Sequence, residues 1–129
     1  MSTDLTMLVW SAVLTFVQVL PYVNGRLLTN WTLADAVGNR EKDPPDAAWV
    51  GRAVRAHTNM VENLPIFAAL VLVAHVTSHA NAMTALGAQI FFWARLVYAG
   101  VYIAGIPYLR TLVWLVSIIG MAIIFFQIV

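Results

Sequence analysis

The chain of 129 residues contains no cysteine and few charged residues. Without cysteine it can form no disulfide, no thiolate-bound metal site and no cysteine nucleophile, so any thiol chemistry must use the thiol of a substrate. Charged residues make up 10% of the chain and hydrophobic residues 61%. Soluble domains have roughly one quarter charged and about one half apolar residues. The composition therefore excludes an ordinary soluble domain and predicts an integral membrane protein.

Four apolar segments are long enough to span a membrane, because a hydrocarbon layer of about 30 Å needs roughly 20 helical residues. The sequence predicts an all-α integral membrane protein, a four-transmembrane-helix bundle that forms a single membrane domain over residues 1–129. Pro21 falls inside the first helix and should kink it. No basic segment precedes this helix, which favours a retained span over a cleaved signal peptide. The expected helices cover about residues 5–28, 47–78, 82–104 and 109–129.

A polar connection separates the first two helices. Between Thr29 and Ala48 the helical pattern stops and charged residues, glycine and two prolines gather, so a solvated loop is expected. Asp46 is a plausible cap for the second helix. Arg26, at the boundary of the first helix, is typical of an interfacial arginine that extends its side chain toward water. The tryptophans, including Trp31, are typical of interfacial anchors or packing residues.

Positive charge is unevenly distributed, and this sets the predicted orientation. The second connection and both termini carry no lysine or arginine. Because basic residues concentrate on the cytoplasmic side, the first and third connections are expected to face the cytoplasm. Both termini should then lie away from the cytoplasm, in an inner or cell membrane. The basic residues at or near the first and third connections are Arg26, Arg40, Lys42, Arg52, Arg55 and Arg110.

The second helix carries a polar stripe near its start. Arg52, Arg55, Asn59 and Glu62 are spaced at i, i+3, i+7 and i+10, so they lie on one helix face. Most other residues of this helix are apolar. One face that carries two cations, an amide and a carboxylate requires a polar partner within the bundle.

The third helix supplies such a partner. An unpaired Arg95 inside this helix would cost at least about 2.5 to 3.5 kcal/mol. Helical rise places Glu62 and Arg95 about 18 and 14 Å from the cytoplasmic boundary, which predicts an ion pair between them, whether purely structural or part of a site. Tyr98 and Tyr102 follow Arg95 at i+3 and i+7. The remaining cations form a pocket that suits an anionic ligand with an apolar part.

The histidines give weaker signals. His75 and His79 have the i, i+4 spacing of metal ligands, but no third ligand stands near them in the sequence. No metal site is predicted, and the role of this pair stays open. His57 points away from the polar stripe by helical angle and is interpreted as interfacial.

Two motifs resemble the MAPEG family, the membrane-associated proteins in eicosanoid and glutathione metabolism. RAHTNMVENLP, residues 55–65, is similar to its second-helix signature, and ARLVYAGVYIAGIPYLRTLVW, residues 94–114, looks like its third helix, turn and fourth-helix start. The chain looks like a bacterial-type member. The resemblance implies a homotrimer that binds glutathione at subunit interfaces near the cytoplasmic boundary. It implies that Arg110 activates the glutathione thiol. The glutathione-binding positions it implies are Arg26, Arg55, Asn59, Glu62, Tyr98 and Tyr102.

Three functions are compatible with these observations. The first, favoured by Arg110, Tyr98 and Tyr102, is a membrane-bound glutathione-dependent transferase or peroxidase acting on hydrophobic electrophiles from the bilayer, with glutathione activated as thiolate. The alternative is a non-catalytic membrane protein that holds a lipid or another anionic ligand in the same pocket. The third is a small transporter or channel subunit that uses Glu62 and Arg95 for charge movement. Membrane lipid is an expected partner and nucleic acid is not.

Overall fold

The computed structural model describes residues 1–129, and every regular element in it is a helix. Four units are long and apolar enough to cross a membrane, with α1 and α2 together forming the first of them. The predicted four-helix membrane bundle is therefore confirmed. The helices are α1 (Thr3–Val17), α2 (Val19–Leu28), α3 (Leu33–Val37), α4 (Ala48–Val76), α5 (Ala82–Ala104) and α6 (Pro107–Ile128).

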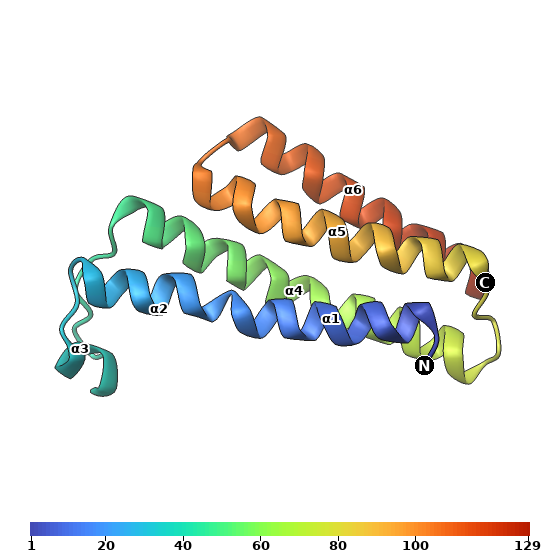
Figure 1. The fold of residues 1–129 in the computed structure, drawn as a ribbon, viewed down its shortest axis with the longest axis horizontal. Coiled ribbons are helices and arrows are strands. Elements are labelled where there is room, and N and C mark those ends of the chain that lie inside the picture. Colours follow the sequence, from blue (N-terminus) through green and yellow to red (C-terminus); the bar gives the residue numbers. More distant parts are fainter.

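The long helices run up and down beside one another (Figure 1). α5 and α6 form a closely packed hairpin, and α1 and α4 pack against α5. The two termini and the α4–α5 connection lie at one end of the bundle, whereas the α2–α4 and α5–α6 connections lie at the other. Both termini therefore lie on one side of a membrane that the bundle spans. That this side faces away from the cytoplasm stays a prediction.

The first span is broken at Gln18, just before Pro21. α1 ends at Val17 and α2 begins at Val19. Proline has no N–H group, so Pro21 cannot donate to the carbonyl of Val17, and its ring crowds that carbonyl. The structure thus shows a break in the first span, which the proline places one turn earlier in the chain than Pro21 itself.

The first connection contains more structure than the sequence predicted. Thr32 and Asp35 form a capping box at the start of α3, in which the Thr32 N–H donates to Asp35 Oδ2 over 2.8 Å and the Asp35 N–H donates to Thr32 Oγ1 over 3.3 Å. The expectation of an unbroken loop was wrong here, because a threonine followed three residues later by an acid supplies both caps of a short helix. Trp31 beside α3 is only 4% exposed, so it packs inside this connection.

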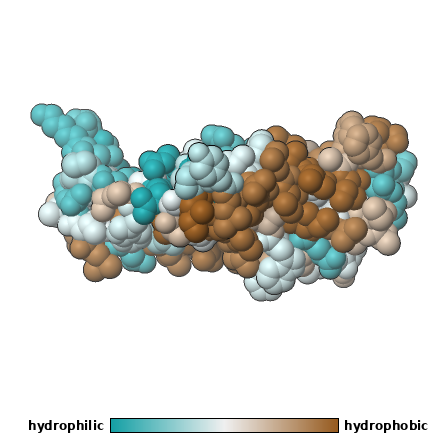
Figure 2. Space-filling model, turned by 90° about the horizontal axis from the view of Figure 1, so that it is seen from above, coloured by the Kyte–Doolittle hydropathy of each residue, from teal (hydrophilic) through white to brown (hydrophobic).

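Aromatic and aliphatic side chains fill the centre of the bundle. The rings of Phe67 in α4 and Phe91 in α5 stack with their centroids 3.9 Å apart, and Met60, Val71 and Ile124 are fully buried in the same cluster. Many other large hydrophobic side chains point outward. Figure 2 shows hydrophobic residues over the middle of the molecule and hydrophilic residues gathered mostly toward its ends. This outer surface suits contact with lipid.

The α5–α6 hairpin is held by direct backbone contact at two glycines. A Cβ atom on Gly87 would lie 2.5 Å from the carbonyl oxygen of Gly120, and one on Gly120 would lie 2.6 Å from the carbonyl oxygen of Gly87. Side-chain rotation cannot relieve contacts this short, because the atoms concerned belong to the backbone. Helices in lipid associate mainly through such close packing of small residues.

We expect Gly87→Ala to lower the free energy of unfolding by about 1 to 3 kcal/mol, because the added methyl group forces α5 and α6 apart. Thermal unfolding of the detergent-solubilised protein measures this loss. Gly51→Ala is the matched control, since its Cβ would lie 3.3 Å from the movable end of the Arg55 side chain. That control should keep or slightly raise the melting temperature, because alanine favours helix. Equal melting temperatures for the two variants would contradict the role of the glycine contact.

Candidate functional site

A groove lies between α4, α5 and the beginning of α6. Its cavity has a volume of about 320 Å³ and is lined mainly by polar and charged side chains. A smaller cavity of about 130 Å³ shares Asn59, Tyr98 and Arg110 with it and extends to Thr111 and Trp114. The groove thus brings together six of the seven residues that the sequence predicted. The residues that line the larger cavity are Arg55, Thr58, Asn59, Glu62, Tyr98, Tyr102 and Arg110.

α4 supplies one wall of the groove. Arg55, Asn59 and Glu62 lie on one face of this unbroken helix, as their spacing predicted, and Thr58 joins them. Arg55 and Glu62 are exposed within the single chain, whereas Asn59 is half-buried. Neither Arg55 nor Glu62 forms an ion pair with another residue of the chain. This wall therefore offers a cation, an anion and an amide to a ligand.

The turn between α5 and α6 positions the opposite wall. Gly105 adopts a left-handed conformation with φ of 80°, which ends α5, and Pro107 starts α6 immediately afterwards. The turn leaves the Arg110 guanidinium 4.5 Å from the centroid of the Tyr102 ring, and the Arg55 guanidinium lies 6.0 Å from the same ring. Two cations that are distant in sequence thus lie near one aromatic ring.

Arg52 belongs to the fold instead of the groove. Its Nε donates to the carbonyl oxygen of Ile103 over 2.9 Å, which satisfies one of the carbonyls left free at the end of α5. The same nitrogen would lie 3.2 Å from a Cβ on Gly105. The prediction that Arg52 belongs to the cationic pocket was wrong, because this side chain holds the turn that precedes Arg110.

The predicted ion pair between Glu62 and Arg95 does not form in the chain. Arg95 is 1% exposed, donates from NH2 to Asn59 Oδ1 over 2.7 Å and lies 4.2 Å from the centroid of the Tyr98 ring. Glu62 instead lines the groove. Helical rise estimates the depth of a residue but not the direction of its side chain, and Arg95 extends into the bundle toward Asn59.

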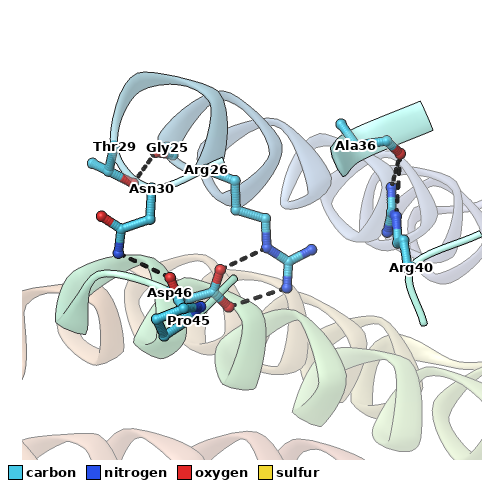
Figure 3. A network of polar contacts seen from close by, with 8 residues as sticks. All are labelled: Gly25, Arg26, Thr29, Asn30, Ala36, Arg40, Pro45 and Asp46. Atoms are coloured by element: carbon cyan, nitrogen blue, oxygen red, sulfur yellow. Dashed lines mark hydrogen bonds and ion pairs between the residues drawn. The ribbon is translucent and has the colours of Figure 1, made fainter. Parts of the chain in front are cut away.

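Arg26 is the predicted site residue that lies outside the groove. Its Nε and NH2 donate to the two carboxylate oxygens of Asp46 over 2.8 and 3.1 Å, as Figure 3 shows. This is the only ion pair in the chain. The guanidinium also lies 5.2 Å from the Tyr22 ring centroid and 4.4 Å from the Trp31 ring centroid. Within one chain, Arg26 is engaged by these three side chains.

Asp46 does not cap α4, contrary to the prediction. The capping position is Ala47, which offers no side-chain hydrogen bond. The Asp46 carboxylate is occupied by Arg26, and next to it Asn30 Nδ2 donates to the carbonyl oxygen of Pro45 over 2.8 Å (Figure 3). These contacts join the end of α2 to the start of α4.

Several site residues were missed from the sequence. Thr58 follows Arg55 at i+3 and was detectable from its place beside the stripe, whereas Trp114 was interpreted only as an anchor or packing residue. Asn63 is 8% exposed and donates to Asn59 Oδ1 over 3.1 Å. Nothing in the sequence distinguishes a buried asparagine of this kind from an interfacial one.

None of the three histidines lines the groove. His75 is near the end of α4 and His79 follows in the connection to α5, and both are exposed. His57 is half-buried, with its ring centroid 5.5 Å from that of Tyr22. No group of three histidine, cysteine or acidic side chains in the chain could hold a metal ion.

Comparison with known proteins identifies one family. The model of the MAPEG family matches residues 5–129, which include the three helices that line the groove and both motifs of residues 55–65 and 94–114. No curated protein shows significant similarity to the chain.

We expect Asp46→Asn to lower the free energy of unfolding by about 1 to 2 kcal/mol, because it weakens a partly buried bidentate contact with Arg26. Thermal unfolding measures the loss, and limited proteolysis should show faster cleavage in the α2–α4 connection. Glu41→Gln removes a charge from the same connection at a residue that forms no ion pair, so it serves as the control. A melting temperature unchanged by Asp46→Asn would contradict this prediction, because it would mean that water replaces the contact with Arg26 without loss of stability.

Proposed function

Since the chain belongs to the MAPEG family, we propose that it is a membrane-bound glutathione-dependent transferase or peroxidase acting on hydrophobic electrophiles. The observation that carries this proposal is the pair of guanidinium groups on Arg55 and Arg110, both beside Tyr102 and neither in an ion pair. Such a groove, next to a surface that suits lipid, can receive an anionic thiol from water and an apolar electrophile from the bilayer.

The groups in the groove match those of glutathione. Arg55 and Arg110 can hold carboxylates or a thiolate, and Glu62 can accept hydrogen bonds from the ammonium group of the ligand. Asn59 and the tyrosine hydroxyls can pair with its peptide groups. Glutathione thus offers a partner for each charged side chain of the groove, since Arg55, Glu62 and Arg110 form no ion pair within the chain.

The proposed chemistry begins with the thiol of glutathione. A cysteine thiol has a pKa of about 8.5 and is mostly protonated at neutral pH, so it needs a nearby cation to become a good nucleophile. Arg110 can supply this cation without titrating, because arginine stays protonated. The thiol proton passes to water, the thiolate sulfur forms a bond to the electrophilic carbon, and the leaving group departs with the electron pair of its bond.

A second candidate function uses the same groove without catalysis. The smaller cavity extends from Asn59 to Trp114 of α6, a helix that also exposes the apolar side chains of Leu112 and Leu115. An anionic lipid could place its headgroup beside Arg55 and Arg110 and its chain along this surface. Thiolate formation separates the two functions, since only the enzyme requires it.

We also propose that the groove is completed in a homotrimer. Arg55 and Glu62 are exposed in the single chain, although such groups are costly next to lipid. On α5, Gly100 and Ala104 are exposed, and a Cβ on Gly100 would meet no atom within 4 Å. This face allows close approach of another helix. Arg26 would contact glutathione only across such an interface.

We expect Arg110→Ala to lower turnover of glutathione with a chloronitrobenzene at least tenfold while changing glutathione affinity much less, because the interaction lost is made mainly with the developing thiolate. Steady-state kinetics measures turnover and calorimetry measures binding. The ultraviolet absorbance of bound thiolate should also disappear.

The control for this prediction is Arg40→Ala. Arg40 donates only to the carbonyl oxygen of Ala36 in the first connection, so this variant removes an arginine outside the groove and should keep normal turnover. Normal turnover in Arg110→Ala, or a parent protein that binds glutathione without forming thiolate, would favour the non-catalytic function.

We expect the protein to have the mass of three chains in mild detergent, and Gly100→Leu to reduce both the trimer fraction and glutathione affinity, because a large side chain blocks the close approach of a second subunit. Native mass spectrometry and calorimetry measure the two quantities. A monomer that still binds glutathione at full affinity would contradict the proposed interface.

A further inference from the structure

Arg95 presents an unusual problem inside the bundle. Its side chain is buried and has no carboxylate partner, and only its NH2 group makes a hydrogen bond, which goes to Asn59 Oδ1. Its Nε and NH1 atoms are enclosed without partners. A cation buried in this way in a membrane is costly, and an apolar side chain would fill the same space more cheaply. Asn59 is therefore the only residue that Arg95 can hold in place through a hydrogen bond.

The contact with Arg95 determines which way the Asn59 amide faces. Arginine can only donate hydrogen bonds, so the atom of Asn59 that meets it must be the amide oxygen. Asn63 Nδ2 donates to the same oxygen over 3.1 Å, which supports this orientation. The two donors hold the oxygen toward the interior of the bundle.

The amide nitrogen of Asn59 must then point the other way. It donates to no group of the chain, and it is not among the enclosed polar atoms that lack a partner. Asn59 lines both the larger and the smaller cavity. Its NH2 group is consequently available to a molecule in the groove.

We propose that Arg95 is a positioning residue that holds the Asn59 amide with its NH2 group toward the groove, so that this part of the groove selects a hydrogen-bond acceptor on the ligand. Such an acceptor is a peptide carbonyl or a carboxylate oxygen. The inference rests on the proposed function insofar as it takes glutathione, which carries both groups, as the ligand.

The positioning is useful because a free amide can turn over. Its oxygen and nitrogen ends have nearly the same shape, so without Arg95 only the longer contact from Asn63 would oppose the reversed orientation, in which the wrong end would repel an acceptor. Fixing the orientation before binding removes that cost. Arg95 also lies against the Tyr98 ring, which lines both cavities, so it supports two neighbouring parts of the groove wall.

A double-mutant cycle for glutathione affinity tests whether Arg95 acts through Asn59. By calorimetry, Asn59→Ala should weaken glutathione binding about tenfold. Arg95→Met should weaken it by a similar factor in the parent protein but cause little further loss when Asn59 is already alanine. Arg95→Lys, which keeps a donor, should restore part of the affinity lost in Arg95→Met. Losses that multiply in the double variant would overturn the proposal.

A second readout needs no ligand. In NMR spectra of protein labelled with ¹⁵N-asparagine, the side-chain amide signal that Asn59→Ala removes identifies the Asn59 NH2 group. Arg95→Met should shift this signal, whereas Arg40→Met, which removes an arginine in the first connection, should leave it in place. An unshifted signal in Arg95→Met would overturn the proposal. If Arg95→Met does not assemble, Arg95→Lys takes its place in both experiments, with smaller changes expected.

The two readouts also separate this inference from the proposed function. A parent protein that binds no glutathione would remove the proposed function, and the Asn59 signal alone would then decide whether Arg95 positions the amide. A parent that binds glutathione, together with an Arg95→Met variant of normal affinity and normal Asn59 signal, would leave the function intact and overturn the positioning.

Discussion

Helices that pack in hydrocarbon gain little from the exclusion of water, and this constraint explains how the bundle is held together. Close approach and hydrogen bonds must do what apolar burial does in a soluble protein. At one end of the bundle, α5 and α6 meet backbone to backbone at Gly87 and Gly120. Toward the other end, arginine side chains join the elements, as in the contact between Arg52 and the last turn of α5. Small residues therefore hold the helices together at one end of the bundle, and polar contacts hold them together toward the other.

The same constraint explains what is left for a ligand. Most arginines donate hydrogen bonds within their own chain, to a carboxylate, a backbone carbonyl or a side-chain amide. Arg55 and Arg110 have only the Tyr102 ring beside them, and Glu62 has no cationic partner. The groove therefore gathers three charged side chains that have no ion-pair partner within the chain. The arginines engaged by their own chain are Arg26, Arg40, Arg52 and Arg95.

The walls of the groove are supported from behind by groups that a ligand would never touch. Arg52 holds the turn at Gly105, from which α6 carries Arg110 to the groove, and Arg95 and Asn63 hold Asn59. In both cases a buried or half-buried donor satisfies an oxygen that would otherwise be free. Rigid support of this kind lets a site on membrane helices present its groups in one geometry, which lowers the cost of binding.

The sequence by itself determined the spans and the helix faces of the site. Apolar length predicted the four crossing units, the residues of α5 were predicted at both ends, and Pro21 indicated the break in the first span. The spacing of Arg55, Asn59 and Glu62 placed them on one face of α4. These features depend on helical geometry and on the length of apolar runs, both of which are local properties that can be read from a single chain.

Only the tertiary structure decided which partner each long side chain takes. Arg95 bonds to Asn59 instead of Glu62, and Asp46 receives Arg26 instead of capping α4. Helical rise and periodicity give the depth and the face of a Cα atom, but an arginine can extend several ångströms in many directions and reach more than one neighbouring helix. Its choice depends on the packing of all the helices together, which the sequence of one segment does not contain.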